Sequence, residues 1–531
     1  MPLPSLTRRG RQLGALLDEA AARHPANVLI LDHELDAAPE LGRRATVAEV
    51  AETVAELSSR IWASGVRAGD PVVVYKSDGF DITLLALAAA RAGAVPVLLS
   101  SALDGETVTA LLRRTGRPTL VTDQAKLDGE LPPSVTGETA RVLRVDGSGP
   151  GADGVVALPE LAGAERIAPV AADLSEPALI THTSGTTGVP KLAVQTGATL
   201  RARYQLHARS LVPLVPGRET LAMHISFAHS RMVSMLSLAL RRGLPTVVLS
   251  DESPEHVADY FARLRPGIVE AHPNSFMAWE PLADHPRRPL AGVKLFSSTF
   301  DALHPRTVHR LLGASERRTP LFGQMYGQTE SGPAVGRVFT RRRSPHADGR
   351  CVGFPFAGMT AVRVVSRNGR PPSADNPGHI EVRAKGGFVT YLGERERYEQ
   401  QLAPGGWWRM GDVGYRTRWG CLHVLDREVD VIDDFCSTLE AEDRLLSRMD
   451  ELSEVVIVRG ADGTPVPVVC TQDDRPLNVT AWRAAASCLP PMADPVHWRA
   501  AELPKTATMK IKRRELERVL AERRQAPTRT R

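Results

Sequence analysis

Residues 181–194 read THTSGTTGVPKLAV, a run of hydroxyls and glycines with one lysine. The part up to Thr183 is strand-like, turn chemistry follows it, and KLAVQT (191–196) alternates again as a second strand. Gly185 and Gly188 permit positive φ and let backbone N–H groups approach an anion without a Cβ in the way, while Lys191 adds a mobile positive charge. The stretch therefore predicts a phosphate-holding loop between two strands. A solvent-exposed hairpin turn is the alternative.

This loop differs from the P-loop of nucleotide triphosphatases, which needs G-x-x-x-x-G-K-[ST] at the start of a helix. Here Pro190 and Leu192 flank Lys191, and a helix is expected to begin only near Ala198. The loop is therefore suited to phosphates by a different arrangement, in which the hydroxyls of Ser184, Thr186 and Thr187 add donors to those of the backbone.

Outward from the loop, apolar strands alternate with amphipathic helices. The segment TVAEVAETVAELSSRIWASGV (46–66) has helical spacing and leads into the strand PVVVYK (71–76), and HVADYFARLRPGIVEA (256–271) repeats the alternation. This rhythm favours a mostly parallel sheet. After about residue 345 short alternating strands with glycine and proline turns predict a small antiparallel module. From about residue 440 helix and strand alternate again, which predicts a separate C-terminal domain of roughly 100 residues.

The composition is typical of a soluble globular protein, with 531 residues, 43% hydrophobic residues and a formal charge of +5. The basic run 341–343 has no aromatic or groove-reading motif beside it, so it predicts a solvated loop and no nucleic-acid partner. Five widely spaced cysteines without a C-x-x-C pair predict free thiols, with neither a disulfide framework nor a structural zinc site. No apolar run approaches the roughly 18 residues that span a bilayer, and the N-terminus lacks a signal-peptide pattern, so we expect a cytoplasmic protein without a membrane partner.

Further motifs follow the phosphate loop in order along the chain: QMYGQTESG (324–332), GGWWRMGDVGYR (405–416), LDREVDVI (425–432) and LPKTATMKIKRREL (503–516). The first motif is expected to form one short loop, and Asp412 of the second is expected in a tight turn. With these motifs the chain resembles the superfamily of adenylate-forming enzymes, which includes acyl-CoA synthetases, luciferases and the adenylation domains of peptide synthetases. Its motif style is closest to that of acyl-CoA synthetases, and the resemblance covers nearly the whole chain.

The resemblance implies an α/β fold with a large N-terminal domain over residues 1–426. That domain would contain two stacked α/β sheet subdomains and a small β-barrel-like module at about 346–426. A small mobile C-terminal α+β domain, residues 427–531, would carry Lys510 and rotate between two half-reactions.

The resemblance also implies the site residues. The loop would hold the β- and γ-phosphates of ATP through Thr183, Ser184, Gly185, Thr186, Thr187 and Gly188, with Lys191 nearby. Tyr326, within Tyr326-Gly327-Gln328, would stack near the adenine, Thr329 would contact the α-phosphate, and Glu330 would hold Mg²⁺, which takes one or two carboxylates plus phosphate oxygens. Asp412 and Arg427 would contact the ribose hydroxyls, and Lys510 would bridge the substrate carboxylate and the α-phosphate. His229 either packs as a wall of the acyl pocket or acts in catalysis.

Several positions depart from the family pattern. Thr299, Phe300 and Asp301 stand where small residues usually line the adenine, and a phenyl ring at such a close approach can occlude or restack a base. Met410 replaces a threonine, Met509 replaces the glycine before Lys510, and Val429 replaces a polar hinge residue. Cys436 stands where a glycine normally follows the hinge strand. The substituted positions include ones that the family uses for adenylation and ones that it uses for thioesterification.

We therefore expect a carboxylic acid:CoA ligase that uses ATP, with AMP as product, together with Mg²⁺ and coenzyme A. Gln328 favours this interpretation over a peptide-synthetase domain, and because no carrier-protein domain follows on this chain, coenzyme A is favoured over a carrier protein as acceptor. An enzyme specialised for one half-reaction is the second interpretation: it makes an acyl adenylate or thiolates a supplied one. A non-catalytic nucleotide- or acyl-binding protein is the third. The acid stays unidentified, and a homodimer is compatible with the sequence.

Overall fold

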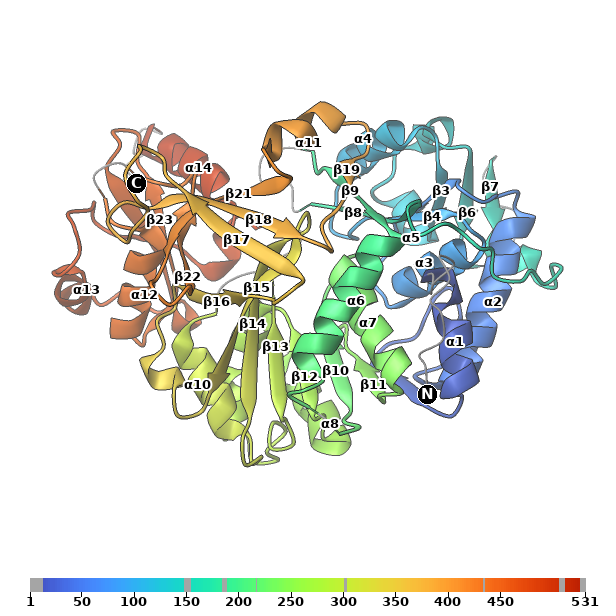
Figure 1. The fold of residues 1–531 in the computed structure, drawn as a ribbon, viewed down its shortest axis with the longest axis horizontal. Helices are drawn as coiled ribbons and strands as arrows, with labels where there is room; N and C mark the ends of the chain where they lie inside the picture. Colours follow the sequence, from blue (N-terminus) through green and yellow to red (C-terminus); the bar gives the residue numbers. More distant parts are fainter. Residues whose placement is uncertain are drawn as a thin grey trace, which may run out of the picture.

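Three β-sheets with helices between and around them form the chain in a computed structural model, which describes residues 13–147, 154–183, 189–215, 217–299, 303–432, 435–505 and 511–525 (Figure 1). The order of strands in the largest sheet is β17-β18-β21-β22-β16-β15-β14-β13-β12-β10-β11-β1-β2, with β20 paired to β21. The second sheet has the order β19-β9-β8-β4-β3-β5-β6-β7, and the third β23-β24-β25.

The largest sheet has a parallel half and an antiparallel half. Its parallel strands are β1 (Val28–Leu31), β10 (Leu221–His224), β11 (Thr246–Val248), β12 (Ile268–Ala271), β13 (Leu295–Ser298) and β14 (Leu321–Gln328), with β2 (Arg44–Thr46) antiparallel at the edge. Its antiparallel strands are β15 (Gly332–Thr340), β16 (Cys351–Pro355), β17 (Thr360–Val365), β18 (Gly378–Ala384), β20 (Leu402–Ala403), β21 (Trp407–Arg416) and β22 (Leu422–Arg427). Antiparallel pairing begins with β15 at Gly332, somewhat before the change of texture predicted near residue 345.

The second sheet carries the opening motif. Its strands are β3 (Pro71–Val74), β4 (Val95–Leu98), β5 (Thr119–Thr122), β6 (Arg141–Arg144), β7 (Val155–Ala157), β8 (Pro177–His182), β9 (Leu192–Thr196) and β19 (Thr390–Tyr391). All pairs are parallel except β8–β9 and β9–β19. The loop at 183–191 therefore joins two antiparallel neighbours, and the edge strand beside it comes from much later in the chain.

Helices pack between these two sheets and over their outer faces (Figure 1). In chain order they are α1 (Leu16–Arg23), α2 (Val47–Ala63), α3 (Asp81–Arg91), α4 (Gly105–Thr115), α5 (Gln124–Asp128), α6 (Gly197–Leu211), α7 (Ser230–Arg242), α8 (Pro254–Leu264), α9 (Pro273–Ala278), α10 (Pro305–Ala314) and α11 (Arg395–Gln401). Short 3₁₀ turns lie at Leu13–Ala15, Pro39–Leu41, Pro133–Glu138, Leu158–Leu161, Glu280–Asp284, Ser344–His346, Gln472–Asp474 and Ala500–Glu502.

Helix α2 illustrates why these segments become helices. Thr46 accepts a hydrogen bond from the backbone of Glu49, whose side chain accepts from the backbone of Thr46, so a capping box fixes the first turn. Its apolar face includes Val50, which joins a core cluster with Val74 of β3 and Met223 of β10. One continuous core therefore lies between the two large sheets, and the expectation of stacked α/β subdomains is confirmed.

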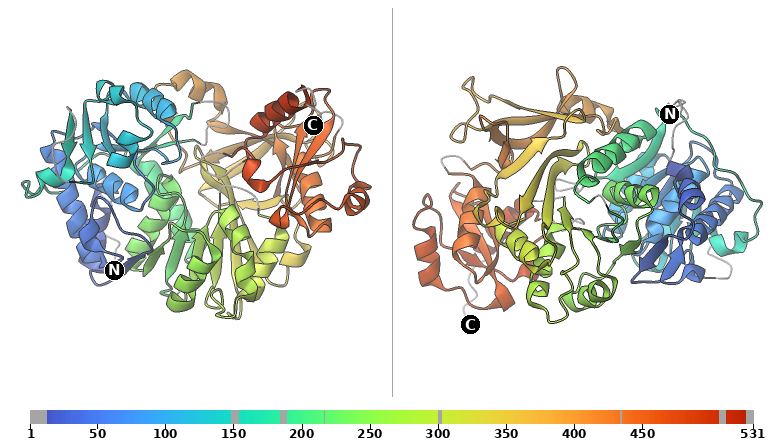
Figure 2. Two further views of the ribbon diagram at one scale, coloured as in Figure 1. Left: turned by 180° about the vertical axis from the view of Figure 1, so that it is seen from behind. Right: turned by 60° about the horizontal axis from the view of Figure 1, so that its bottom comes forward.

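The C-terminal domain packs against the antiparallel half of the largest sheet (Figure 2). It consists of α12 (Thr438–Arg448), β23 (Leu452–Arg459), β24 (Pro465–Thr471), α13 (Val479–Ala486), β25 (Val496–His497) and α14 (Arg513–Gln525). Arg513 forms a partly buried bidentate ion pair with Glu442, at 2.7 Å for both contacts, which fastens α14 to α12. The mixed helix and strand content agrees with the expected smaller C-terminal domain.

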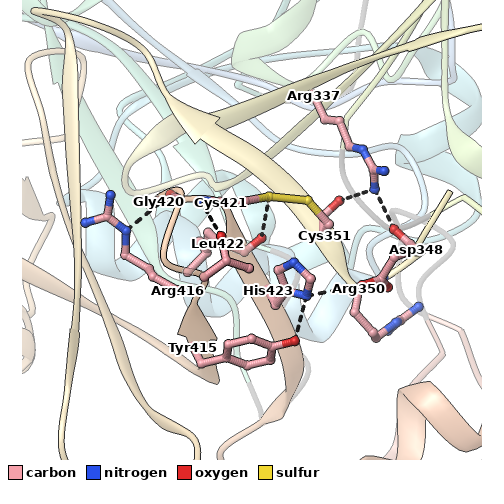
Figure 3. The surroundings of a disulfide bond; sticks show 11 residues. Arg337, Asp348, Arg350, Cys351, Tyr415, Arg416, Gly420, Cys421, Leu422 and His423 are labelled. Carbon is pink, nitrogen blue, oxygen red and sulfur yellow. Dashed lines mark hydrogen bonds and ion pairs between the residues drawn. A yellow bond between two sulfur atoms is a disulfide. The ribbon is translucent and has the colours of Figure 1, made fainter. Parts of the chain in front are cut away.

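Three expectations from the sequence are wrong. Cys351 and Cys421 are joined by a disulfide, although free thiols were expected, because β16 and β22 are neighbours in the sheet despite a sequence separation of 70 (Figure 3). Asp412 lies inside strand β21, not in a tight turn. QMYGQTESG is the end of β14 and a short turn into β15, not one loop.

Among the residues that the structure describes, no helix has both the length and the apolar character needed to cross a lipid bilayer.

Candidate functional site

The two ends of the predicted phosphate loop are tied together. The backbone N–H of Thr183 donates to the carbonyl of Lys191 at 2.9 Å, and the backbone N–H of Lys191 donates to Thr183 Oγ1 at 3.2 Å. Thr183 is buried, so this hydroxyl serves the loop closure in the structure. The intervening residues Ser184, Gly185, Thr186, Thr187 and Gly188 lie outside the described residues.

Lys191 and Glu330 meet beside the loop, together with a residue that the sequence analysis missed. The ammonium of Lys191 lies 3.7 Å from Glu330 Oε1 and 3.0 Å from the hydroxyl of Tyr391, which donates to Glu330 Oε1 at 2.6 Å. The ammonium also sits 4.6 Å from the centre of the Tyr391 ring. Burial lowers the pKa of Lys191, against the opposing effect of the Glu330 charge. The predicted phosphate lysine and the predicted magnesium carboxylate therefore share one site.

Tyr326, Asp412 and Arg427 form a second group. Tyr326 lies near the end of β14 and donates its hydroxyl to Asp412 Oδ2 at 2.5 Å, while Arg427 Nε lies 3.6 Å from Asp412 Oδ1. Asp412 and Arg427 are cross-strand partners in β21 and β22, which explains how residues 15 apart converge. Burial, followed by the Asp412 charge, raises the pKa of Tyr326 well above its usual value, so the phenol is neutral and donates. The three residues expected at the nucleoside are thus brought together.

The backbone around this group is closely packed. A Cβ added to Gly327 would collide with the carbonyl of Gly332, so no larger residue fits there. Gln328 donates to the carbonyl of Met410, which lies buried in β21. The methionine that departs from the family pattern therefore acts here through its backbone, which any residue could supply.

Arg203 of α6 is a site residue that the sequence analysis missed. It is fully buried and donates to the carbonyl of Thr329 at 2.8 Å, the carbonyl of Gly386 at 2.7 Å and Ser230 Oγ at 2.9 Å. Burial lowers its pKa to about 10, although the Glu330 charge raises it. Arg203 thereby fixes the turn at Thr329 and Glu330 from behind, and among many surface arginines no sequence signal marked it.

Polar side chains gather at the carboxyl ends of the parallel strands, where α/β sheets usually bind their ligands. His224 ends β10, His272 follows β12, and Ser298 ends β13. His224 Nδ1 is 2.8 Å from Ser275 Oγ, and His272 Nε2 accepts from the backbone of Ser226 at 3.0 Å. Among the described residues, the buried Ser298 Oγ has no hydrogen-bond partner. Thr299, expected near the adenine, is buried directly after Ser298.

His229 lies at the start of α7, where its Nδ1 accepts from the backbone N–H of Arg231 at 3.0 Å and caps the helix. Burial lowers its pKa well below 6.5, and His272 and Arg203 act in the same direction. Burial also lowers the pKa of His224. His224 and His229 are therefore neutral at pH 7. For His229 the cap supports the packed-wall interpretation, while its role in catalysis stays a prediction.

A buried ion pair stands behind this region. Arg231 binds both carboxylate oxygens of Glu270, at 2.7 and 2.9 Å, and its third nitrogen lies 2.9 Å from the ring of His207. The side chain of Glu270 is 0% exposed and that of Arg231 is 3% exposed. This pair joins the first turn of α7 to β12.

Beyond Arg427 the chain turns into the C-terminal domain. Asp426 Oδ1 accepts from Thr438 Oγ1 at 2.7 Å and from the backbone of Leu439 at 3.3 Å, so it holds the start of α12. Burial raises the pKa of Asp426 to about 6. Val429, the expected hinge residue, is 53% exposed. Phe300, Asp301, Met509 and Lys510 lie outside the described residues, so their predicted roles stay predictions.

Comparison with known proteins agrees with this geometry. The family described as AMP-binding enzyme matches residues 17–392. The 3-amino-2-hydroxy-4-methoxybenzoate diazotase of Streptomyces cremeus is 46% identical over 96% of both chains, and the 2-succinylbenzoate–CoA ligase of Geobacillus kaustophilus is 27% identical over 90% of this chain and 94% of the ligase. The solved structure of the anthranilate CoA ligase AuaEII with anthranoyl-AMP superposes with a TM-score of 0.81 at 19% identity, covering 97% of this chain and 98% of that one.

Proposed function

Since the chain belongs to the AMP-binding enzyme family, we propose that it is an ATP-dependent diazotase. It would convert the aromatic amino group of an aminobenzoate into a diazonium group. The observation that carries this proposal is the 46% identity over 96% of both chains to a diazotase of an amino-hydroxybenzoate. The pairing of Lys191 with Glu330 and of Tyr326 with Asp412 supports the proposal further, because these are the residues expected to bind the nucleotide.

The chemistry follows from what an adenylate-forming site can activate. A diazonium needs a second nitrogen at the oxidation level of nitrite, and nitrite is an oxyanion like a carboxylate. One nitrite oxygen attacks the α-phosphorus of ATP, pyrophosphate leaves, and a mixed nitrosyl–AMP anhydride results. The amine nitrogen then attacks the nitrosyl nitrogen, AMP leaves, and the N-nitrosamine takes up a proton and loses water. No step changes the total electron count, so no separate oxidant is required.

The first half of this chemistry depends chiefly on neutralising phosphate charge. Lys191 and the loop that begins at Thr183 would hold the β- and γ-phosphates, and Asp412 with Arg427 would bind the ribose. Glu330 is a buried carboxylate already oriented by Tyr391, and it would hold Mg²⁺ against the phosphate oxygens, a donor set that suits this ion. The bound ion would supply charge neutralisation for the departing pyrophosphate.

The second half needs an amine with a free lone pair. His224 and His229 stand at the carboxyl ends of the parallel strands, and burial lowers the pKa of each ring. A nearby carboxylate would stabilise the protonated amine, whereas neutral imidazoles carry no charge that would do so. The amine therefore keeps its lone pair and stays nucleophilic. Within the part of the chain that the structure describes, the Ser298 hydroxyl has no hydrogen-bond partner, and it would offer one hydrogen bond to a ring substituent. These groups support an aromatic substrate with polar substituents.

Coenzyme A ligation of an aromatic acid is the second candidate function. The observation in its favour is the 27% identity over nearly the full length of a CoA ligase. The nucleotide residues are the same in both proposals, so they do not separate them. The two proposals differ in the acceptor of the activated group, which is an aromatic amine in the first and a thiol in the second.

The test supplies the purified chain with ATP, Mg²⁺ and a panel of aminobenzoic acids, with nitrite or with coenzyme A. AMP release that requires both nitrite and the amine, together with an azo dye after coupling to 2-naphthol, supports the diazotase, and ¹⁵N-nitrite should place its label in the dye. AMP release and acyl-CoA formation without nitrite would support the ligase instead. Pyrophosphate exchange with neither product would indicate an enzyme of one half-reaction, and nucleotide binding without turnover would overturn both proposals.

A further inference from the structure

A group of three metal-ligating side chains lies on strand β16 and at the start of strand β22, the strand that ends in Arg427. The Sγ atoms of Cys351 and Cys421 and a ring nitrogen of His423 all lie within 4.8 Å of one another. The two cysteines are joined by a disulfide in the structure, and the imidazole sits directly beside them (Figure 3). We propose that the reduced chain binds one divalent metal ion of the zinc class through Cys351, Cys421 and His423.

The strand geometry puts these three side chains on one face. Cys351 of β16 is the cross-strand partner of His423 of β22, and such partners project to the same side of a sheet. Cys421 precedes His423 by two residues, the spacing at which side chains along a strand return to one face. Cys421 is also held at the end of the hairpin turn, where its carbonyl accepts from the backbone of Thr417 at 2.9 Å. Register and turn together therefore position the ligand set.

The histidine is oriented as metal-bound histidines are. Its Nδ1 lies 3.3 Å from Asp348 Oδ2 and 3.0 Å from the hydroxyl of Tyr415, while the other ring nitrogen points toward the sulfurs (Figure 3). A carboxylate on the far nitrogen of a ligating imidazole fixes the ring and raises its basicity, and such partners recur at metal sites. Asp348 and Tyr415 are therefore the positioning residues of the site. Their contacts with His423 are a second observation, besides the ligand cluster itself, that supports metal binding.

The donor chemistry selects the class of ion. Two thiolates and one imidazole are soft and borderline donors that suit Zn²⁺ or Co²⁺ and not Mg²⁺ or Ca²⁺. Three protein ligands leave a fourth tetrahedral position for water. His423 is 8% exposed and Cys421 9%, whereas Cys351 is only partly buried, so solvent reaches the group from the Cys351 side.

The disulfide and the metal exclude each other. A phosphine reductant converts the disulfide to two thiols, taking the oxygen of one water molecule to become the phosphine oxide. Metal binding then displaces the two thiol protons, because thiolates are the ligands. The thiol count of the unfolded chain should accordingly rise from three to five on reduction.

The test uses the full chain, reduced without air and freed of reductant, and titrates it with Co²⁺. We expect one equivalent of Co²⁺ per chain, a thiolate-to-cobalt absorption band, and loss of that band when Zn²⁺ is added. The oxidised wild-type chain should show no band. Cys351→Ser and Cys421→Ser should abolish it, while Cys488→Ser, which changes an exposed thiol elsewhere, should leave it intact.

Asp348→Asn should keep the band but weaken Co²⁺ affinity about 10- to 100-fold, the effect typical of losing such a carboxylate partner. A folded chain with five free thiols that gives no band in excess Co²⁺ would overturn the proposal. So would a band that survives in Cys351→Ser, or a disulfide that cannot be reduced unless the chain unfolds. These readouts are independent of ATP, nitrite and coenzyme A, so the metal site and the proposed function fail separately.

Discussion

The hydroxyl of Tyr326 lies 2.5 Å from the carboxylate of Asp412, across the junction between the parallel and antiparallel halves of the largest sheet. The contact joins the end of β14 to β21, and Arg427 approaches the other carboxylate oxygen from β22. Three strands therefore converge on one carboxylate, which can accept hydrogen bonds from both hydroxyls of a ribose.

Asp412→Asn should weaken ATP binding about 10- to 100-fold, since hydrogen bonds to a charged acceptor contribute about 1.5–3 kcal/mol each. Isothermal titration of the folded variant with ATP measures this change. Tyr326→Phe is the matched control: it keeps the carboxylate and removes one neighbouring hydroxyl, so its loss should be smaller. An unchanged affinity in Asp412→Asn would mean that the ribose binds elsewhere.

Glu330→Gln should raise the Mg²⁺ concentration needed for half-maximal pyrophosphate release by about tenfold or more, because a neutral amide is a poorer ligand for Mg²⁺ than a carboxylate. Tyr391→Phe removes the phenol that donates to Glu330 but leaves the charge, so its Mg²⁺ requirement should stay close to that of the wild type. Equal Mg²⁺ curves for Glu330→Gln and wild type would remove the metal role from Glu330.

Lys510→Ala should abolish adenylate formation, measured as pyrophosphate exchange, because it removes the charge expected to bridge the attacking oxyanion and the α-phosphate. Transfer from a supplied adenylate should be largely spared. A variant that loses both steps equally would show that this lysine has another task.

Glu270→Gln should destabilise the fold by about 3–5 kcal/mol, because it leaves the buried guanidinium of Arg231 without its charge partner. Urea unfolding measures the loss. The double variant Arg231→Met with Glu270→Leu should recover much of it, since it removes both charges together. A double variant as unstable as the single one would indicate that packing, and not the unpaired charge, causes the loss.

Asp426 should make stability fall as the pH rises. Burial raises the pKa of its carboxyl from 3.8 to about 6, so the native state holds the proton more tightly than the unfolded chain. The resulting stabilisation is fully present below 3.8 and is lost as the pH rises through about 6. At 1.36 kcal/mol per pKa unit the change is about 3 kcal/mol.

The measurement is the unfolding free energy of the wild type minus that of Asp426→Asn, followed from about pH 4 to about pH 7, and the difference should decrease by most of that amount. Asp450→Asn, whose side chain is 93% exposed, is the control and should run parallel to the wild type. A flat difference for Asp426→Asn would contradict the raised pKa.

Much of the fold could be predicted from the sequence because the helix and strand periods are strong. The long helix 46–66 and the strand after it appear as α2 and β3. The site motifs were also found, because Lys191, Glu330, Tyr326 and Asp412 lie within short recognisable runs, and the structure brings them together in pairs.

What the sequence could not indicate depends on pairing between distant segments. Asp412 was expected in a tight turn, yet it lies within strand β21, where Gly411 before it adopts a φ of 72°. Cys351 and Cys421 become neighbours only through the register of β16 and β22. Arg203 donates to the carbonyl of Thr329, 126 residues further along the chain. Tyr391 contacts Glu330, 61 residues before it, and Lys191, 200 residues before it, and no local pattern encodes such contacts.

The edge strand β19 limits where the chain can be truncated. Its two residues, Thr390 and Tyr391, pair with β9, so the segment after residue 345 completes the sheet that carries the phosphate loop. In a fragment ending near residue 345, the wholly buried strand Leu192–Thr196 would become an exposed edge strand. Its unpaired backbone groups could then pair with another chain. A shortened chain must therefore include β19 to keep this edge paired.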